Sequence, residues 1–243
     1  MKSRALVIGG ILCFSMNAYA YRPFDGTDAD VAETGHIELE IGPLGYLRTQ
    51  HDSALVLGNG VFNFGFIPRW ELVIAGQGIF GLDPAPPPRF QNGSIFLKHT
   101  LREGTLQGEH GISLALEFGV LFPTSDAPFV DAGLHACLIA SYAWPHFVMH
   151  VNTWIERGVD GQTDLFLGTI FEAHQSARIR PVAEIFLDRH GGDVQPSVLI
   201  GTILTVNDHL SFDAATRLAY TSGASLFEVR AGLTWTIVAF RHR

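Results

Sequence analysis

The sequence FEVRAGLTWTIVAF, residues 227–240, decides the fold that this chain is expected to adopt. Successive side chains of an extended strand point to opposite faces, so residues two apart share a face. One face is apolar throughout and consists of Phe227, Val229, Ala231, Leu233, Trp235, Ile237 and Ala239. The other face carries Glu228, Arg230, Gly232, Thr234 and Thr236. This alternation is typical of a barrel strand that has lipid on one side and a polar lumen on the other.

The chain begins with the parts of a bacterial secretory signal. Lys2 and Arg4 supply positive charge, residues 5–16 are apolar, and an A-x-A cleavage site ends at Ala20. We therefore predict cleavage after Ala20 and delivery of residues 21–243 to the bacterial outer membrane. Of the two cysteines only Cys137 would remain, so no disulfide framework is possible.

Composition narrows the class of protein further. The mature part of the 243-residue chain is long enough for one large β domain, and 47% of the whole chain is hydrophobic. The formal charge is -8, and it becomes more negative once the basic signal is removed. An acidic balance argues against nucleic acid as a partner. The uncharged stretch 132–155 would bury four polar side chains as a spanning helix and break at Pro145, so we predict two strands joined at Trp144-Pro145.

The alternating pattern recurs at the spacing of hairpins. It predicts strands at 36–48, 54–66, 70–80, 93–103, 111–121, 132–143, 146–156, 164–173, 178–188, 196–206, 208–220 and 226–240. We therefore predict an all-β fold, a transmembrane antiparallel β-barrel of about twelve strands with a range of 10 to 14, because most segments have the length that a tilted strand needs to cross a bilayer. If the mature N-terminus is periplasmic, short turns fall on that side and longer loops outside.

The identity of the two faces matters because a water-soluble β-sandwich has the same alternation, with its apolar face inside. The signal, the length, the even number of strands and the terminal strand favour the barrel. In a barrel the charged face is the lumen. The predicted lumen-lining residues are Lys98, Arg102, Glu117, Glu156, Asp164, Glu172, Arg178, Arg180, Glu184, Asp188, Asp213, Arg217, Glu228 and Arg230.

Two interpretations of these inward charges stay open. They form a structural network that fills a narrow lumen, or they line a solute path and set its selectivity. The segment 21–35 has no strand pattern and carries Asp25, Asp28, Asp30 and Glu33. It lies free in the periplasm, or it folds into the lumen where inward arginines would bind its carboxylates.

Several short motifs carry a resemblance to a known family. They are Arg22-Pro23-Phe24, Asp28-Ala29, Gly35, Glu38, Glu40 and Gly42, followed by looser matches at 122–124, 150–152, 183–184 and 232–236. The series resembles the outer-membrane transporter family named for the meta-pathway of phenol degradation. The resemblance implies an outer-membrane channel, no catalytic residue and, through the family's name, an aromatic solute. The segment 230–237 also resembles the signal by which the barrel-assembly machinery binds a C-terminal strand.

Some outer-membrane barrels are lipid hydrolases, which need a serine, a histidine and an orienting polar group within hydrogen-bond reach. His110 lies near Ser113, and His150 shares a strand face with Asn152, but the His-x-Ser-Asn-Gly signature of barrel phospholipases is absent. The eleven histidines are scattered and form no metal-binding motif. We predict no enzyme, no cofactor and no metal.

The sequence thus predicts a passive channel or transporter for a small solute. The family resemblance implies that this solute is aromatic or hydrophobic. The protein's predicted partners are outer-membrane lipid, the barrel-assembly machinery and the solute. The alternatives are a structural or interaction barrel and an outer-membrane lipid hydrolase.

Overall fold

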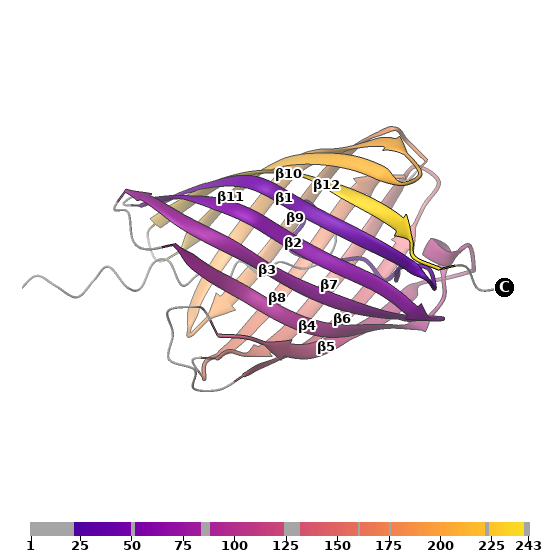
Figure 1. Ribbon diagram of the computed structural model, residues 1–243, viewed down its shortest axis with the longest axis horizontal. Helices are drawn as coiled ribbons and strands as arrows, with labels where there is room; N and C mark the ends of the chain where they lie inside the picture. Colours follow the sequence, from indigo (N-terminus) through magenta and orange to yellow (C-terminus); the bar gives the residue numbers. More distant parts are fainter. Residues whose placement is uncertain are drawn as a thin grey trace, which may run out of the picture.

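The structure is a computed structural model, and it describes residues 22–49, 52–83, 88–123, 132–159, 161–174, 176–221 and 224–240. The predicted signal 1–20 lies outside the described residues. The described chain forms a closed barrel with the N-terminal segment inside it (Figure 1).

Twelve antiparallel strands make the wall, in the order of the sequence. They are β1 His36–Arg48, β2 Ser53–Ile67, β3 Trp70–Asp83, β4 Arg89–Arg102, β5 Ser113–Leu121, β6 Gly133–Ala143, β7 Phe147–Arg157, β8 Thr163–Ala173, β9 Ile179–His190, β10 Asp193–Asn207, β11 Leu210–Thr221 and β12 Ala224–Val238. A 3-10 turn, η1 Thr105–Gln107, lies between β4 and β5. Each predicted strand corresponds to one of these, which confirms the antiparallel barrel.

The first and last strands close the barrel. β1 pairs with β12 from His36↔Val238 to Arg48↔Phe227, with a shift in register between Ile41 and Leu44. Because every edge is paired, the wall leaves no backbone row open to lipid. Pro43 lies within that irregular stretch, where the lack of a backbone N–H costs least.

The outer surface is apolar and the interior is polar. Ile179 and Ile200 are each 65% exposed, whereas Glu117 and Glu184 are completely buried. A water-soluble sandwich would have the opposite arrangement, since an apolar belt of this extent is unfavourable in water. The apolar face of β12 points outward, as predicted, and includes the exposed residues Phe227, Val229 and Trp235. The described residues include no helix with the length and apolar character needed to cross a membrane.

The connections show where strand prediction fell short. The uncharged stretch 132–155 forms β6 and β7, as predicted. The predicted loop 189–195 is a two-residue turn, because both Gly191 (φ 58°) and Gly192 (φ 116°) adopt the positive φ that such a turn requires. Several strands therefore extend further than predicted, and the connections at the two ends differ less in length than the sequence suggested.

Aromatic rings gather on the outside near the turns that join β2 to β3 and β6 to β7. Trp144 stacks on Phe147 with ring centroids 4.5 Å apart, and Trp70 stacks on His99 at 4.2 Å. Rings in this position suit the interface between membrane and water, where one side is apolar and the other is wet. This is the end of the barrel that is predicted to be periplasmic.

Candidate functional site: the lumen and its N-terminal segment

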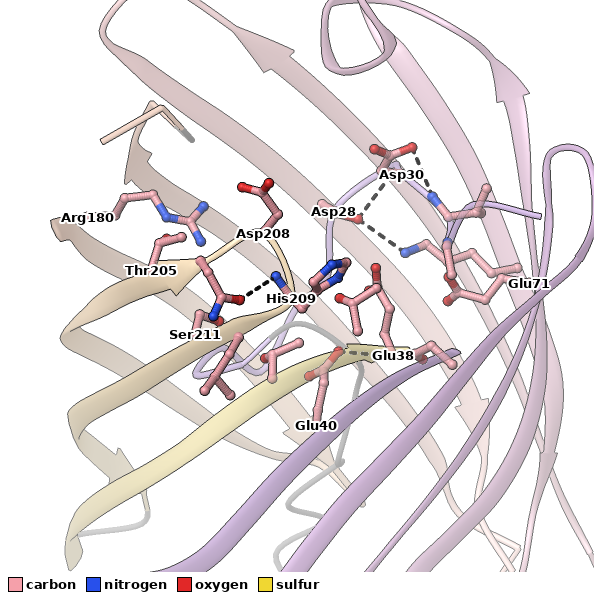
Figure 2. Close-up of a pocket in the computed structure, with 18 residues that line it drawn as sticks. Asp28, Asp30, Glu38, Glu40, Glu71, Arg180, Thr205, Asp208, His209 and Ser211 are labelled. Carbon is pink, nitrogen blue, oxygen red and sulfur yellow. Dashed lines mark hydrogen bonds and ion pairs between the residues drawn. The ribbon is translucent and has the colours of Figure 1, made fainter. Parts of the chain in front are cut away.

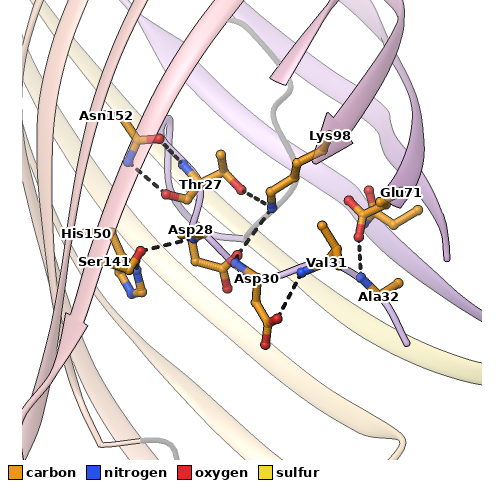
Figure 3. Close-up of polar contacts among 12 residues, drawn as sticks. Thr27, Asp28, Asp30, Val31, Ala32, Glu71, Lys98, Ser141, His150 and Asn152 are labelled. Carbon is orange, nitrogen blue, oxygen red and sulfur yellow. Dashed lines mark hydrogen bonds and ion pairs between the residues drawn. The ribbon is translucent and has the colours of Figure 1, made fainter. Parts of the chain in front are cut away.

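Residues 22–35 run along the inner wall of the barrel before β1 begins. Their contacts pass from β11 and β12 to β9, then to β7 and β6, and finally to β3 and β2. The sequence left open whether this segment lies in the periplasm or in the lumen. In the structure, residues 22–35 lie in the lumen. Figure 3 shows the middle of the segment held by side chains of several strands.

Arg22 fixes the beginning of the described segment. Its Nε and Nη2 donate to the two carboxylate oxygens of Asp213, at 3.1 and 3.2 Å, and its backbone N–H donates to Glu40. The guanidinium lies against Gly42 and Gly232, where an added Cβ would come within 2.4 and 2.2 Å of guanidinium nitrogens. The bidentate geometry is the one that arginine offers a carboxylate best. The two glycines supply the space for it.

Phe24 occupies an apolar pocket within the lumen. The ring is 3% exposed and clusters with inward side chains of β8, β9, β10 and β11. These are Ile170, Val182, Leu199, Ile203 and Ala215. Burying a phenylalanine of this size contributes roughly 1.5–3 kcal/mol, which makes it the main apolar anchor of the segment.

Asp25 and Gly26 are bound by charged groups of the wall. The Glu184 carboxylate accepts the backbone N–H of both residues, each at 2.8 Å. The Asp25 carboxylate in turn accepts from Arg230 at 2.8 Å and lies 3.5 Å from Arg217. The wall therefore binds both the backbone and the side chain at this point, which specifies one position for the segment.

The next residues are bound in the same way. Asn152 accepts the Thr27 N–H at 3.0 Å and donates to the Thr27 carbonyl at 2.7 Å, a pairing that imitates a neighbouring strand. Lys98 donates to the Thr27 hydroxyl and lies 3.3 Å from Asp28. The segment therefore replaces the water that these buried wall groups would otherwise need.

The segment leaves the lumen past η1 and the ends of β2 and β3. The Gln107 amide donates to the Asp30 carboxylate at 3.1 Å, and Glu71 accepts the Ala32 N–H. Burial raises the pKa of the Asp30 carboxyl, and the nearby Asp28 carboxylate raises it further. The Ala32 carbonyl crosses so close to Gly65 that a Cβ there would come within 2.1 Å of it.

Most of the residues predicted to line the lumen lie inside the barrel. Nine are buried, namely Lys98, Glu117, Glu156, Asp164, Glu172, Glu184, Asp213, Arg217 and Glu228. Arg180, Asp188 and Arg230 are partly buried, whereas Arg102 and Arg178 are exposed at strand ends. Arg230, Glu228 and Arg217 are brought together with Asp25, and Arg180 lies 3.2 Å from Glu172.

Other residues of this site were not predicted. Glu40 of β1 and Glu71 of β3 accept backbone N–H groups of the segment and are not among the predicted lumen-lining residues. Neither are Asn152 and Ser141, which also bind the segment. Ser141 accepts the Ala29 N–H at 3.0 Å. The alternation along each strand indicates that these side chains face the lumen. It does not indicate where the irregular segment lies, and so it does not show which of them bind it.

An arc of rings lies on the inner wall beyond the segment. Trp154 stacks on Phe166 with an interplanar angle of 5° and centroids 5.2 Å apart, and Phe186 follows at 5.2 Å from Phe166. Phe96 and His135 extend the arc at one side, while the Arg217 guanidinium lies 4.7 Å from the Phe186 ring at the other. Stacked rings of this kind favour flat, polarisable partners.

A cavity of about 360 Å³ opens at the predicted periplasmic end, between the segment and the β10–β11 turn (Figure 2). Its lining is rich in carboxylates, which are Asp28, Asp30, Glu38, Glu40, Glu71 and Asp208. Lys98, Arg180 and His209 also line it.

Comparison with known proteins places the fold. No family model matches the chain, and no curated protein matches it. Among solved structures, an outer-membrane channel from Pseudomonas putida F1 has a TM-score of 0.58 at 6% identity, over 88% of this chain and 100% of that one. The NanC porin has a TM-score of 0.56 at 7% identity, over 82% and 98%.

The transport unit of the autotransporter AIDA-I from Escherichia coli has a TM-score of 0.51 at 7% identity, over 86% of this chain and 93% of that one. At such identities the likeness concerns the fold alone. The chain has the closed, twelve-stranded, porin-like barrel fold of outer-membrane channels.

Proposed function

We propose that this protein is a passive outer-membrane channel for a small solute, and that the segment 22–35 gates it. The observation that carries the proposal is a barrel with an apolar exterior and a charged interior, occupied by an irregular segment that is bound mainly by side chains of the wall. Apart from the buried Phe24 ring, its contacts with the wall are mostly hydrogen bonds and ion pairs, each of which water can replace. Release of the segment would leave a polar path.

Osmotic swelling of liposomes tests this function. Liposomes containing the mature chain are expected to swell in an isotonic sugar solution faster than empty liposomes. A variant lacking residues 22–31 should swell faster still. If neither protein increases the rate of swelling, the barrel has a structural or interaction role instead, as the alternative holds.

The class of solute is a separate proposal. The arc of Phe96, Trp154, Phe166 and Phe186 supports an aromatic or hydrophobic solute, in line with the family resemblance. Phenyl glucoside and cyclohexyl glucoside are similar in size, and neither crosses lipid readily. We expect the phenyl compound to permeate faster, and the difference to disappear in Trp154→Leu. Equal rates through the unmodified protein would contradict the preference.

The remaining partners are proposals of the same kind. Membrane lipid would contact the apolar belt, which includes Ile179, Ile200 and Trp235. The barrel-assembly machinery would bind the C-terminal strand, β12.

One contact favours a second candidate, ester hydrolysis inside the lumen. The Ser141 hydroxyl lies 2.8 Å from His150 Nδ1, and Glu172 lies 3.5 Å from His150 Nε2, which is the order of a serine, a base and an orienting acid. A fluorophosphonate probe tests it, since labelling that depends on Ser141 would support hydrolysis. Equal labelling of the unmodified protein and Ser141→Ala would exclude it.

A further inference from the structure

The interior of this barrel has far more carboxylates than basic groups. Among the described residues, the buried charged side chains comprise eleven carboxylates and three lysines or arginines. The carboxylates are Asp25, Asp28, Glu40, Glu71, Glu117, Glu156, Asp164, Glu172, Glu184, Asp213 and Glu228, and the basic residues are Arg22, Lys98 and Arg217. Adding the partly buried Arg180 and Arg230 does not remove the imbalance.

The basic groups are already committed to carboxylates of the wall or the segment. Arg22 binds Asp213 with both of its donors, and Lys98 lies 3.3 Å from Asp28. Arg230 lies 2.8 Å from Asp25 and 2.8 Å from Glu228. The carboxyl groups in excess thus face whatever enters the lumen, and the charge of those that are ionised is felt over about 8 Å at physiological ionic strength. A narrow lumen bounded by protein and lipid concentrates such a field.

An excess of carboxylates also surrounds the 360 Å³ cavity described above. Six carboxylates line it, against two basic side chains and His209. Figure 2 shows that they come from different parts of the chain, with Glu38 and Glu40 on β1, Asp208 in the turn after β10, and Asp28 and Asp30 on the segment. They surround a space larger than a single ion, a size that suits a small organic ligand.

A second feature of the cavity also points to a ligand. Asn63 lines it, is 2% exposed and uses its amide nitrogen to bind Glu40 at 2.9 Å. The Asn63 carbonyl oxygen is buried and has no hydrogen-bond partner among the residues that the structure describes. A buried acceptor without a donor is costly, and a cationic N–H group in the cavity would satisfy it.

We propose that this acidic cavity binds small organic ammonium ions and that the channel selects cations over anions. The inference rests on the proposed channel function for selectivity, whereas binding in the cavity does not depend on conduction. Carboxylates and an amide carbonyl together supply the charge and the acceptors that a primary ammonium needs. The cavity lies at the mouth of the lumen, so it would concentrate such ions at one end of the path.

Selectivity is tested by the reversal potential of the full mature chain across a KCl gradient in a planar bilayer. We expect K⁺ to be favoured over Cl⁻ by roughly tenfold, as charged clefts commonly enrich counter-ions. A ratio of one, or a preference for Cl⁻, would overturn cation selectivity while leaving the channel function intact.

Binding is tested separately by titrating the detergent-solubilised full chain with methylammonium in a calorimeter. The variant Glu38→Gln with Asp208→Asn removes two cavity carboxylates, and we expect it to bind roughly tenfold or more weakly. Asp193→Asn, at the opposite end of β10, removes a charge outside the cavity and should bind as the unmodified chain does. No binding by the unmodified chain, or equal binding by all three proteins, would refute the cavity site even if the protein conducts.

Discussion

At the scale of single residues, the lumen is built to hold an irregular peptide in one position. Glu184 accepts two consecutive backbone N–H groups, and Asn152 pairs with both polar groups of Thr27. Such contacts satisfy backbone N–H and C=O groups as pairing with a strand would. They involve only a few side chains, however, and can be broken one at a time. The residues that bind the segment are therefore the places where a substitution would alter gating and leave the wall intact.

Gly65 offers a direct test of that idea. A Cβ at Gly65 would lie 2.1 Å from the Ala32 carbonyl oxygen, so Gly65→Ala must push the segment away from β2. We expect the open state to be favoured by roughly 1–3 kcal/mol, the cost of the buried hydrogen bonds lost there. Single-channel open probability measures the effect. Gly60→Ala is the matched control in the same strand, because the nearest atom to its Cβ is 3.8 Å away.

At the scale of the element, each strand has one face for lipid and one for the lumen. The sequence predicted this sorting well because period two is a local property, and burying the wrong face in lipid is costly. It predicted strand ends less well. The glycines at 191 and 192 extend the β9–β10 hairpin, and the Gly-Gly pair is itself a sequence signal for a two-residue turn that the predicted strand ends did not take into account.

β12 allows the two faces to be compared within one element. Val229 is on the outer face near the middle of the strand, and Thr234 lines the acidic cavity. We expect Val229→Arg to destabilise the folded barrel by about 2–4 kcal/mol, the usual cost of a charge near the bilayer midplane. Thr234→Arg should have a much smaller effect because carboxylates surround its position. Urea unfolding in lipid vesicles measures both, and equal losses would contradict the assignment of the faces.

At the scale of the whole molecule, the barrel could be predicted but the contents of its lumen could not. Strand number, closure and the inward position of residues such as Glu117 and Glu184 follow from the pattern. The path of residues 22–35 does not, because it depends on contacts between residues more than a hundred positions apart, such as Asp25 with Arg230. The four carboxylates of residues 21–35 were the only signal, and they were compatible with solvent as well as with the lumen.

Single-channel recording of the mature chain, beside a variant that lacks residues 22–31, tests most directly whether the protein is a channel controlled by its own N-terminal segment. Folding of both barrels is checked by their heat-modifiable migration in gels. We predict that the mature chain opens rarely, and that the shortened chain gives larger and longer-lived conductance steps. A folded, shortened barrel whose conductance equals that of the mature chain would contradict the gate. A folded, shortened barrel that gives no conductance would contradict the channel itself.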